Sequence, residues 1–218
     1  MGIYAGNIAF LLRKNDLAPE TVQKALGISA LAHPLPDEIP AVADYFGVTA
    51  ELLLRTDLEQ RENTRSSEIK LVVFDIDGVL TDAGMYYTES GDELKKFNAK
   101  DGLAIRQLAQ RNIKTGIISH GYNTNLIRRR AERLHIGLLE VSQTPKLKTL
   151  NKWCTELNIK TENVCFIGDD INDEDIIRAV GFSACPADAV DTVKNMVNVV
   201  LRKKGGEGCV RELIDLYI

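Results

Sequence analysis

Two patterns of hydrophobic and polar positions divide the chain. Within the first 57 residues, apolar side chains recur every three or four positions in short segments, which is the spacing of amphipathic helices. From residue 70 onward, short continuous apolar runs alternate with helical patterns, as in proteins whose parallel strands are covered on both faces. The pattern therefore predicts a small all-α domain over residues 1–57, a linker over residues 58–69, and an α/β domain with a doubly wound parallel sheet over residues 70–218.

The first domain is predicted to contain four or five short helices. Pro34 and Pro36 exclude a regular helix interior from residues 30–38, so the middle of the domain should lack a helix. Helical spacing covers residues 7–15, 19–27, 38–47 and 49–54. The expected core of this domain consists of Ile8, Phe10, Leu11, Val22, Leu26, Val42 and Phe46.

The apolar run at residues 71–74 ends in two acids, Asp75 and Asp77, and then Gly78. Alternate residues of a strand share a face, so both acids can point toward one ligand at the carboxyl edge of the sheet. One acid can attack phosphorus while the other protonates the leaving alcohol. Gly78 allows a sharp turn that brings backbone N–H groups close to an anion. On this motif alone, a simple strand-end turn remains the alternative.

Two later apolar runs also end in polar side chains. The run within residues 116–121 ends at Ser119, whose hydroxyl can donate to a phosphoryl oxygen. Lys146 follows Pro145 in the first turn of a predicted helix, where its ammonium can reach an anion. The run within residues 165–175 ends in crowded acids, which repel one another unless a cation lies among them, and oxygen ligands favour Mg²⁺. These acids are Asp169, Asp170 and Asp173.

In this order, the four segments resemble the four motifs of the haloacid dehalogenase superfamily of phosphohydrolases. The resemblance covers about residues 70–218 and rests on strand-to-helix boundaries as well as on residue types. It implies that Asp75 is the nucleophile, forming an aspartyl-phosphate, and that Asp77 is the general acid and then the base. It also implies that Ser119, Lys146 and the turn at Gly78 hold the phosphoryl group.

The same resemblance implies a magnesium site. Mg²⁺ would be bound by the side chains of Asp75 and Asp169 and by the main-chain carbonyl of Asp77. Asp170 or Asp173 would hold a metal-bound water or orient the phosphate-binding lysine, as residues around a metal site commonly do.

The spacing of the motifs leaves no room for a cap domain. About 40 residues separate the acids of the first motif from Ser119, and fewer than about 30 separate Ser119 from Lys146. The first interval should hold a β-hairpin over residues 85–97, because two strand-like segments flank the turn residues 89–92. The chain is most similar to the capless branch of 3-deoxy-D-manno-octulosonate 8-phosphate phosphatases, through residues 75–82, 95–102 and 205–212.

Members of that branch are tetramers in which a glycine-rich tail enters the site of the adjacent subunit. The resemblance therefore implies a homotetramer whose residues 205–218 complete a neighbour's site, with Arg211 offered to a substrate carboxylate. The glycines of the tail would allow close approach to another surface. An ordinary glycine loop before a terminal helix is the alternative.

The substrate is expected to be a phosphorylated sugar acid, foremost 3-deoxy-D-manno-octulosonate 8-phosphate. The 9-phosphates of 2-keto-3-deoxy-nononate and N-acylneuraminate are alternatives, because this chain departs from the branch after Ser119. Relatives continue with glycine and a charged residue, whereas His120 stands here. His120 is a candidate substrate contact, although a lone histidine is often only structural. Arg130, in an arginine-rich helix, is a further candidate for binding the sugar acid.

Composition is consistent with a soluble cytoplasmic enzyme. The 218 residues are 44% hydrophobic and 27% charged, enough for one good core and a small appendage. The four cysteines form no C-x-x-C pair, which favours reduced thiols in a reducing compartment. The sequence shows no signal peptide and no apolar run of membrane length, so no membrane partner is expected.

The first domain resembles Cro/repressor-type helix-turn-helix domains at both ends but not in the middle. Residues 30–38 stand where a recognition helix would lie, and they contain no lysine or arginine. Residues 1–69 contain six basic and ten acidic residues, so they carry the whole net charge of −4. DNA binding requires a basic face, so no nucleic-acid partner is expected. A sugar-phosphate-sensing regulator that binds nucleic acid is the less favoured alternative, and a response-regulator receiver is disfavoured by the second acid at Asp77.

Overall fold

The computed structural model describes residues 2–66, 68–121 and 124–218. Its internal contacts divide the chain into two compact units, Met1–Asn63 and Thr64–Ile218, and each is described here by itself. Among the residues that the structure describes, no helix is both long and apolar enough to cross a membrane.

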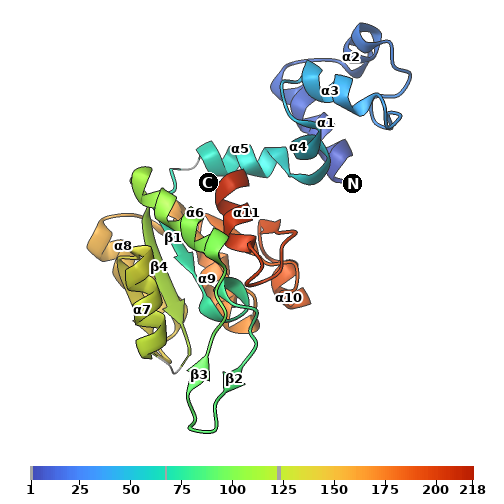
Figure 1. The fold of residues 1–218 in the computed structure, drawn as a ribbon. Coiled ribbons are helices and arrows are strands. Elements are labelled where there is room, and N and C mark those ends of the chain that lie inside the picture. Colours follow the sequence, from blue (N-terminus) through green and yellow to red (C-terminus); the bar gives the residue numbers. More distant parts are fainter. Residues whose placement is uncertain (1, 67, 122–123) are drawn as a thin grey trace. The chain divides into compact units, whose positions relative to one another are not determined.

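The first unit is all-helical, with its helices shown in blue to cyan in Figure 1. Residues 30–38, where the two prolines lie, form turns and no helix. The expected linker is mostly helical, because the last of the helices runs across the boundary between the units. The helices are α1 (Ile3–Lys14), α2 (Pro19–Leu26), α3 (Ile39–Tyr45), α4 (Ala50–Arg55) and α5 (Leu58–Ser66).

Local signals explain where these helices begin and end. Pro19 occupies the first turn of α2, and Gly27 ends that helix in the left-handed conformation with φ of 69°. The core contains Ile8, Leu11, Val22 and Val42 as buried residues, with Phe10, Leu26 and Phe46 partly buried against it. The buried side chain of Asn7 donates to the carbonyls of Leu53 and Thr56 and accepts from the N–H of Leu58. It therefore ties α1 to the junction of α4 and α5.

The second unit is built on a six-stranded parallel sheet in the order β5-β4-β1-β6-β7-β8. This arrangement confirms the predicted doubly wound α/β fold. The strand that precedes the first two acids lies at the centre, between the strands that end at Ser119 and Ile167. The strands are β1 (Leu71–Phe74), β4 (Lys114–Ser119), β5 (Leu138–Val141), β6 (Val164–Ile167), β7 (Phe182–Cys185) and β8 (Val199–Val200).

Helices cover both faces of this sheet (Figure 1). Val72 and Phe74 of β1 pack with helices α6 (Ala99–Gln110), α7 (Thr124–Leu134) and α11 (Cys209–Leu216). The alternate residues, Leu71 and Val73, pack with helices α8 (Lys146–Leu157), α9 (Glu174–Ala179) and α10 (Asp191–Lys194) on the other face. Because both faces are covered, the strand is apolar throughout rather than alternating.

A β-hairpin projects from this unit, as the lower part of Figure 1 shows. Its strands, β2 (Tyr86–Tyr87) and β3 (Glu93–Leu94), pair antiparallel within the predicted range, with Gly91 in the turn at φ of 86°. The described residues between Asp77 and Ser119 form only a short turn, this hairpin, α6 and β4. They contain no cap domain.

The glycine-rich tail packs against its own chain, and its expected contribution to a neighbour's site stays a prediction. A Cβ on Gly205 would lie 1.9 Å from the carbonyl oxygen of Gly78, and the N–H of Gly206 donates to Val79 O at 2.9 Å. The following helix, α11, buries Leu213 in the same core as the sheet. The alternative interpretation, a glycine loop before a terminal helix, describes this segment.

Candidate active site

The first motif forms a tight turn at the carboxyl end of β1. Asp75 is buried, its N–H continues the sheet by donating to Ile167 O at 3.0 Å, and its Oδ1 accepts from Ile76 N at 2.8 Å. The turn that follows, Ile76–Leu80, is closed by the N–H of Thr81, which donates to Ile76 O at 3.0 Å. Gly78 has φ of 81°, and a Cβ there would lie 2.0 Å from Asp169 Oδ2. Glycine therefore allows the two motifs to approach each other.

Three of the predicted acids and the predicted lysine form one buried cluster. Lys146 Nζ lies 2.9 Å from Asp75 Oδ2 and 2.6 Å from Asp173 Oδ1. Oxygens of Asp75, Asp169 and Asp173 all lie within 4.8 Å of one another. Asp173 also accepts from the N–H of Asp169 at 3.0 Å, which fixes its orientation. These four residues, Asp75, Asp169, Asp173 and Lys146, are called the floor of the site below.

The floor carries more negative charge than one lysine neutralises. Burial foremost raises the pKa of Asp75 to about 7, with Asp173 adding to the rise and Lys146 opposing it. Burial and then the neighbouring carboxylates raise the pKa of Asp169 to about 8. For Lys146, burial lowers the pKa, but the ion pairs with the two acids outweigh it and the net shift is upward. The lysine of the floor therefore stays charged, whereas ionisation of the two acids costs free energy.

These residues fit a divalent cation. Asp169 Oδ1 is buried and has no hydrogen-bond partner among the described residues. The donors in the cluster are carboxylate oxygens, which suit Mg²⁺, and a cation would relieve the repulsion that raises the two pKa values. Asp75 and Asp169 would hold the ion, and Asp173, which is within 2.6 Å of Lys146 Nζ, would orient the lysine. Asp170 is exposed and instead caps the short turn Ile171–Asp173 through Ile171 N.

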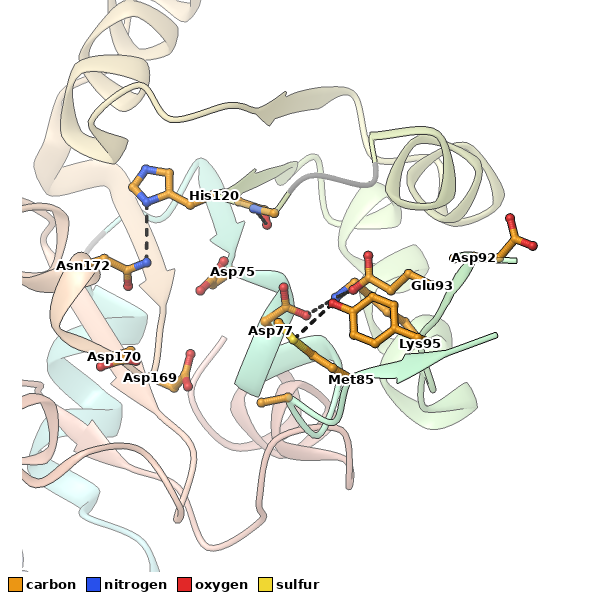
Figure 2. Close-up of a pocket in the computed structure, with 15 residues that line it drawn as sticks. Asp75, Asp77, Met85, Asp92, Glu93, Lys95, His120, Asp169, Asp170 and Asn172 are labelled. Atoms are coloured by element: carbon orange, nitrogen blue, oxygen red, sulfur yellow. Dashed lines mark hydrogen bonds and ion pairs between the residues drawn. The ribbon is translucent and has the colours of Figure 1, made fainter. Parts of the chain in front are cut away.

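Above the floor lies a pocket of about 640 Å³ (Figure 2). Ser119, at the end of β4, is buried and accepts from Gly121 N at 3.1 Å. His120 lines the pocket, with Nε2 3.0 Å from Thr144 O and Nδ1 3.5 Å from the side-chain nitrogen of Asn172. Of the predicted site residues, the pocket is lined by Asp75, Asp77, Ser119, His120, Asp169 and Asp170.

Two predicted substrate contacts do not line this pocket. Arg130 donates to Asn98 O at 3.2 Å and lies over the ring of Phe97, 4.9 Å from its centroid. Arg211 binds the carboxylate of Asp215 one turn further along α11. Arg130 is therefore held at the start of α6 and Arg211 on the surface of its own helix, so the single chain brings neither to the phosphate-binding residues.

Sequence reasoning predicted the hairpin, residues 85–97, beside the site, but not which of its residues form one wall of the pocket. Lys95 reaches Asp77 Oδ1 at 2.5 Å and Glu93 Oε1 at 2.8 Å, as Figure 2 shows. Met85 and Tyr87 also line the pocket. Glu93 and Lys95 stand two positions apart, which places them on one face of an extended segment, but nothing local indicates that this face meets the first motif. This set of residues is called the hairpin wall below.

Known proteins share this arrangement. The model of the haloacid dehalogenase-like hydrolases matches residues 121–213. The chain is 38% identical over 154 residues to the 3-deoxy-D-manno-octulosonate 8-phosphate phosphatase of Yersinia pestis, covering 71% of this chain and 82% of that protein. The chain belongs to the haloacid dehalogenase-like hydrolases. Within that family it is a phosphatase, a hydrolase of phosphoric monoesters.

Solved structures agree with this assignment. The crystal structure of the Yersinia pestis phosphatase has 36% sequence identity and a TM-score of 0.69, covering 72% of this chain and 84% of that one. A 3-deoxy-D-manno-octulosonate 8-phosphate phosphatase from Moraxella catarrhalis, solved with magnesium, phosphate and KDO, has 31% identity and a TM-score of 0.69. It covers 73% of this chain and 90% of that one. The family thus includes a member that holds a divalent cation together with phosphate.

Proposed function

We propose that this phosphatase uses Mg²⁺ to hydrolyse a phosphorylated sugar acid through an aspartyl-phosphate on Asp75. The observation that carries the proposal is the position of Asp75, buried at the base of an open pocket with one oxygen on Lys146 and an acid cluster beside it. A nucleophile needs this combination of access to substrate and charge compensation. Bound Mg²⁺ would neutralise charge on the transferring phosphoryl group.

The surrounding residues supply the remaining steps. Asp75 attacks phosphorus, and Ser119, Lys146 and the backbone of the turn at Gly78 bind the phosphoryl oxygens. Asp77, two residues further on, protonates the leaving alcohol and then takes a proton from the attacking water. His120 lies at the pocket edge, where it can contact the rest of the substrate. Arg130 and Arg211 are left out of this proposal, because within the chain Arg130 binds Asn98 O and Arg211 binds Asp215.

The proposed substrate is 3-deoxy-D-manno-octulosonate 8-phosphate, on which the relatives act according to their names. The 9-phosphates of 2-keto-3-deoxy-nononate and N-acylneuraminate are the alternatives, since His120 stands where these branches differ. A phosphate-release screen of purified protein over phosphorylated sugar acids, with Mg²⁺ and with chelator, tests the proposal. We expect Mg²⁺-dependent release from one sugar acid far above the others. Equal release from many unrelated phosphate esters would contradict a narrow substrate.

Assembly as a homotetramer is also proposed. The support is on the hairpin, where Met85, Tyr86, Tyr87 and Leu94 are each more than half exposed. Apolar side chains gathered in this way commonly mark a protein–protein contact. Sedimentation velocity of the protein tests it: a single species of four chains is expected, and a monomer at micromolar concentration would contradict it.

For the first unit, we propose a degenerate helix-turn-helix module that serves packing or assembly rather than DNA recognition. Turns replace the recognition helix at residues 30–38, and the unit is acidic. The full chain should therefore show no duplex-DNA affinity beyond the non-specific level of about 10⁻⁴ to 10⁻⁶ M. A gel-shift titration at physiological salt checks this, and sequence-specific binding would overturn it. A chain beginning near residue 68 should keep phosphatase activity, because every floor residue lies within the second unit.

A further inference from the structure

Lys95 occupies an unusual position for a lysine in a two-stranded hairpin. Its side chain is only 3% exposed, and its ammonium lies between the carboxylates of Asp77 and Glu93. A buried ammonium is costly unless it is paired, and removing one partner of such a pair leaves a charge without compensation. The ion pair therefore binds the hairpin wall to the first motif.

The two oxygens of Asp77 have different surroundings. Oδ1 accepts from Lys95 Nζ at 2.5 Å and lies 3.4 Å from Thr81 Oγ1. Oδ2 is turned toward the loop after Ser119, 3.7 Å from the place where a Cβ on Gly121 would lie. One oxygen is thus anchored on the hairpin side, and the other faces the phosphate-binding side of the pocket.

From this geometry we infer that Lys95 is a positioning residue for the general acid and base, holding the carboxylate of Asp77 so that Oδ2 faces the leaving group. The inference rests on the proposed role of Asp77. Glu93 keeps the ammonium in place through the second ion pair, and its side chain is itself only 15% exposed. Proton transfer requires the acid within hydrogen-bond reach of the leaving oxygen, so a carboxylate free to rotate is a poorer catalyst.

The neighbouring lysine provides a matched control. Lys96 Nζ lies 2.9 Å from Asp82 Oδ2, but the lysine side chain is 63% exposed, and Asp82 lies outside the pocket. Exposed pairs of this kind contribute little. Lys95→Met and Lys96→Met therefore remove the same charge from adjacent positions of one hairpin, and only the first touches Asp77.

The test compares two phosphate esters with different leaving groups. The sugar acid leaves its phosphate ester as an alkoxide that must be protonated. The leaving group of p-nitrophenyl phosphate is instead a stable phenolate. Lys95→Met should lower kcat/KM on the sugar-acid phosphate by about 10- to 100-fold, less than loss of the acid itself. It should change kcat/KM on p-nitrophenyl phosphate less than about threefold, because kcat/KM reports the step in which the leaving group departs, and little protonation is needed there. Lys96→Met should match wild type on both esters, and Lys95→Arg should recover much of the lost rate.

Two results would overturn the inference. One is a Lys95→Met enzyme as active as wild type on the sugar-acid phosphate, and the other is an equal loss on both esters, which would indicate a general structural effect. A crystal structure of Lys95→Met separates this question from the proposed function. We expect the Asp77 carboxylate to leave its present orientation, and an unmoved carboxylate would overturn the positioning role. Failure of the proposed function would instead appear as wild-type protein releasing no phosphate from either ester.

Discussion

The floor and the hairpin wall hold their charged groups in different ways. Asp75, Asp169 and Asp173 follow the ends of β1 and β6, and Lys146 begins α8, so the floor is fixed by the hydrogen-bond ladder of the central sheet. The wall comes from two strands of two residues each, and its link to the site is one lysine. The comparison suggests that the nucleophile and metal ligands depend on rigid elements, whereas the acid that protonates the leaving group depends on a hairpin.

The largest expected effect comes from the floor. Asp75→Asn removes the nucleophile and a metal ligand together while keeping the side-chain volume, so turnover should fall by about 10⁴-fold or more. The measurement is phosphate release under saturating Mg²⁺, with circular dichroism to show that the fold is kept. Activity near that of wild type would remove Asp75 from its role.

A smaller effect is expected from the residue that joins floor and wall. Asp77→Asn should slow turnover by about 10² to 10⁴, because an amide cannot protonate the leaving alcohol. Mg²⁺ binding should survive, since only the main-chain oxygen of residue 77 is proposed as a ligand. Isothermal titration calorimetry with Mg²⁺ beside steady-state kinetics checks both parts. If Asp75→Asn and Asp77→Asn proved alike in Mg²⁺ binding and in rate, the division of roles would be wrong.

Support beneath the first motif comes from the C-terminal segment. Leu213 of α11 is fully buried, so Leu213→Ala should lower the free energy of unfolding by about 2–5 kcal/mol. Leu103→Ala on the exposed side of α6 is the matched control and should cost much less, since Leu103 is 48% exposed. Urea unfolding of both variants makes the comparison. Equal stability of the two would show that the tail does not belong to this core.

The charge of the floor predicts how stability depends on pH. Burial foremost raises the pKa of Asp75 to about 7 and the pKa of Asp169 to about 8 in the folded protein, above their ordinary value of 3.8. Between these limits the folded state binds more protons than the unfolded chain, so the metal-free protein loses stability as pH rises through this window.

Mg²⁺ should reverse this loss, because it binds the deprotonated acids. The gain in Tm on adding Mg²⁺ should be larger at pH 8.5 than at pH 6. The corresponding gain in the free energy of unfolding should approach about 2.7 kcal/mol when the Mg²⁺ concentration is a hundred times Kd. Thermal melts of wild type and of Asp169→Asn test this, the variant being expected to lose the Mg²⁺ effect. A larger Mg²⁺ effect at pH 6, or an undiminished effect in the variant, would contradict the metal site.

The sequence predicted the sheet and the floor because their signals are local. An apolar run followed by an acid specifies both a strand and the edge where it ends, as at Asp75 and Asp169. The contact between Lys95 and Asp77 was not predicted, because nothing local indicates that this lysine of the hairpin meets the first motif. The helical spacing of Val210, Leu213 and Ile214 indicates the buried face of the terminal helix, whereas the expected contact of the tail with a neighbour came from the family resemblance and stays a prediction.

The most direct test of the central claim is to trap the phosphorylated enzyme. Protein mixed with 3-deoxy-D-manno-octulosonate 8-phosphate and Mg²⁺ is quenched in acid and reduced with borohydride, which converts an aspartyl-phosphate to homoserine. Peptide mass spectrometry should find homoserine at position 75, and none without substrate. Homoserine at another aspartate, or at none while phosphate is released, would contradict the assignment of Asp75 as the nucleophile.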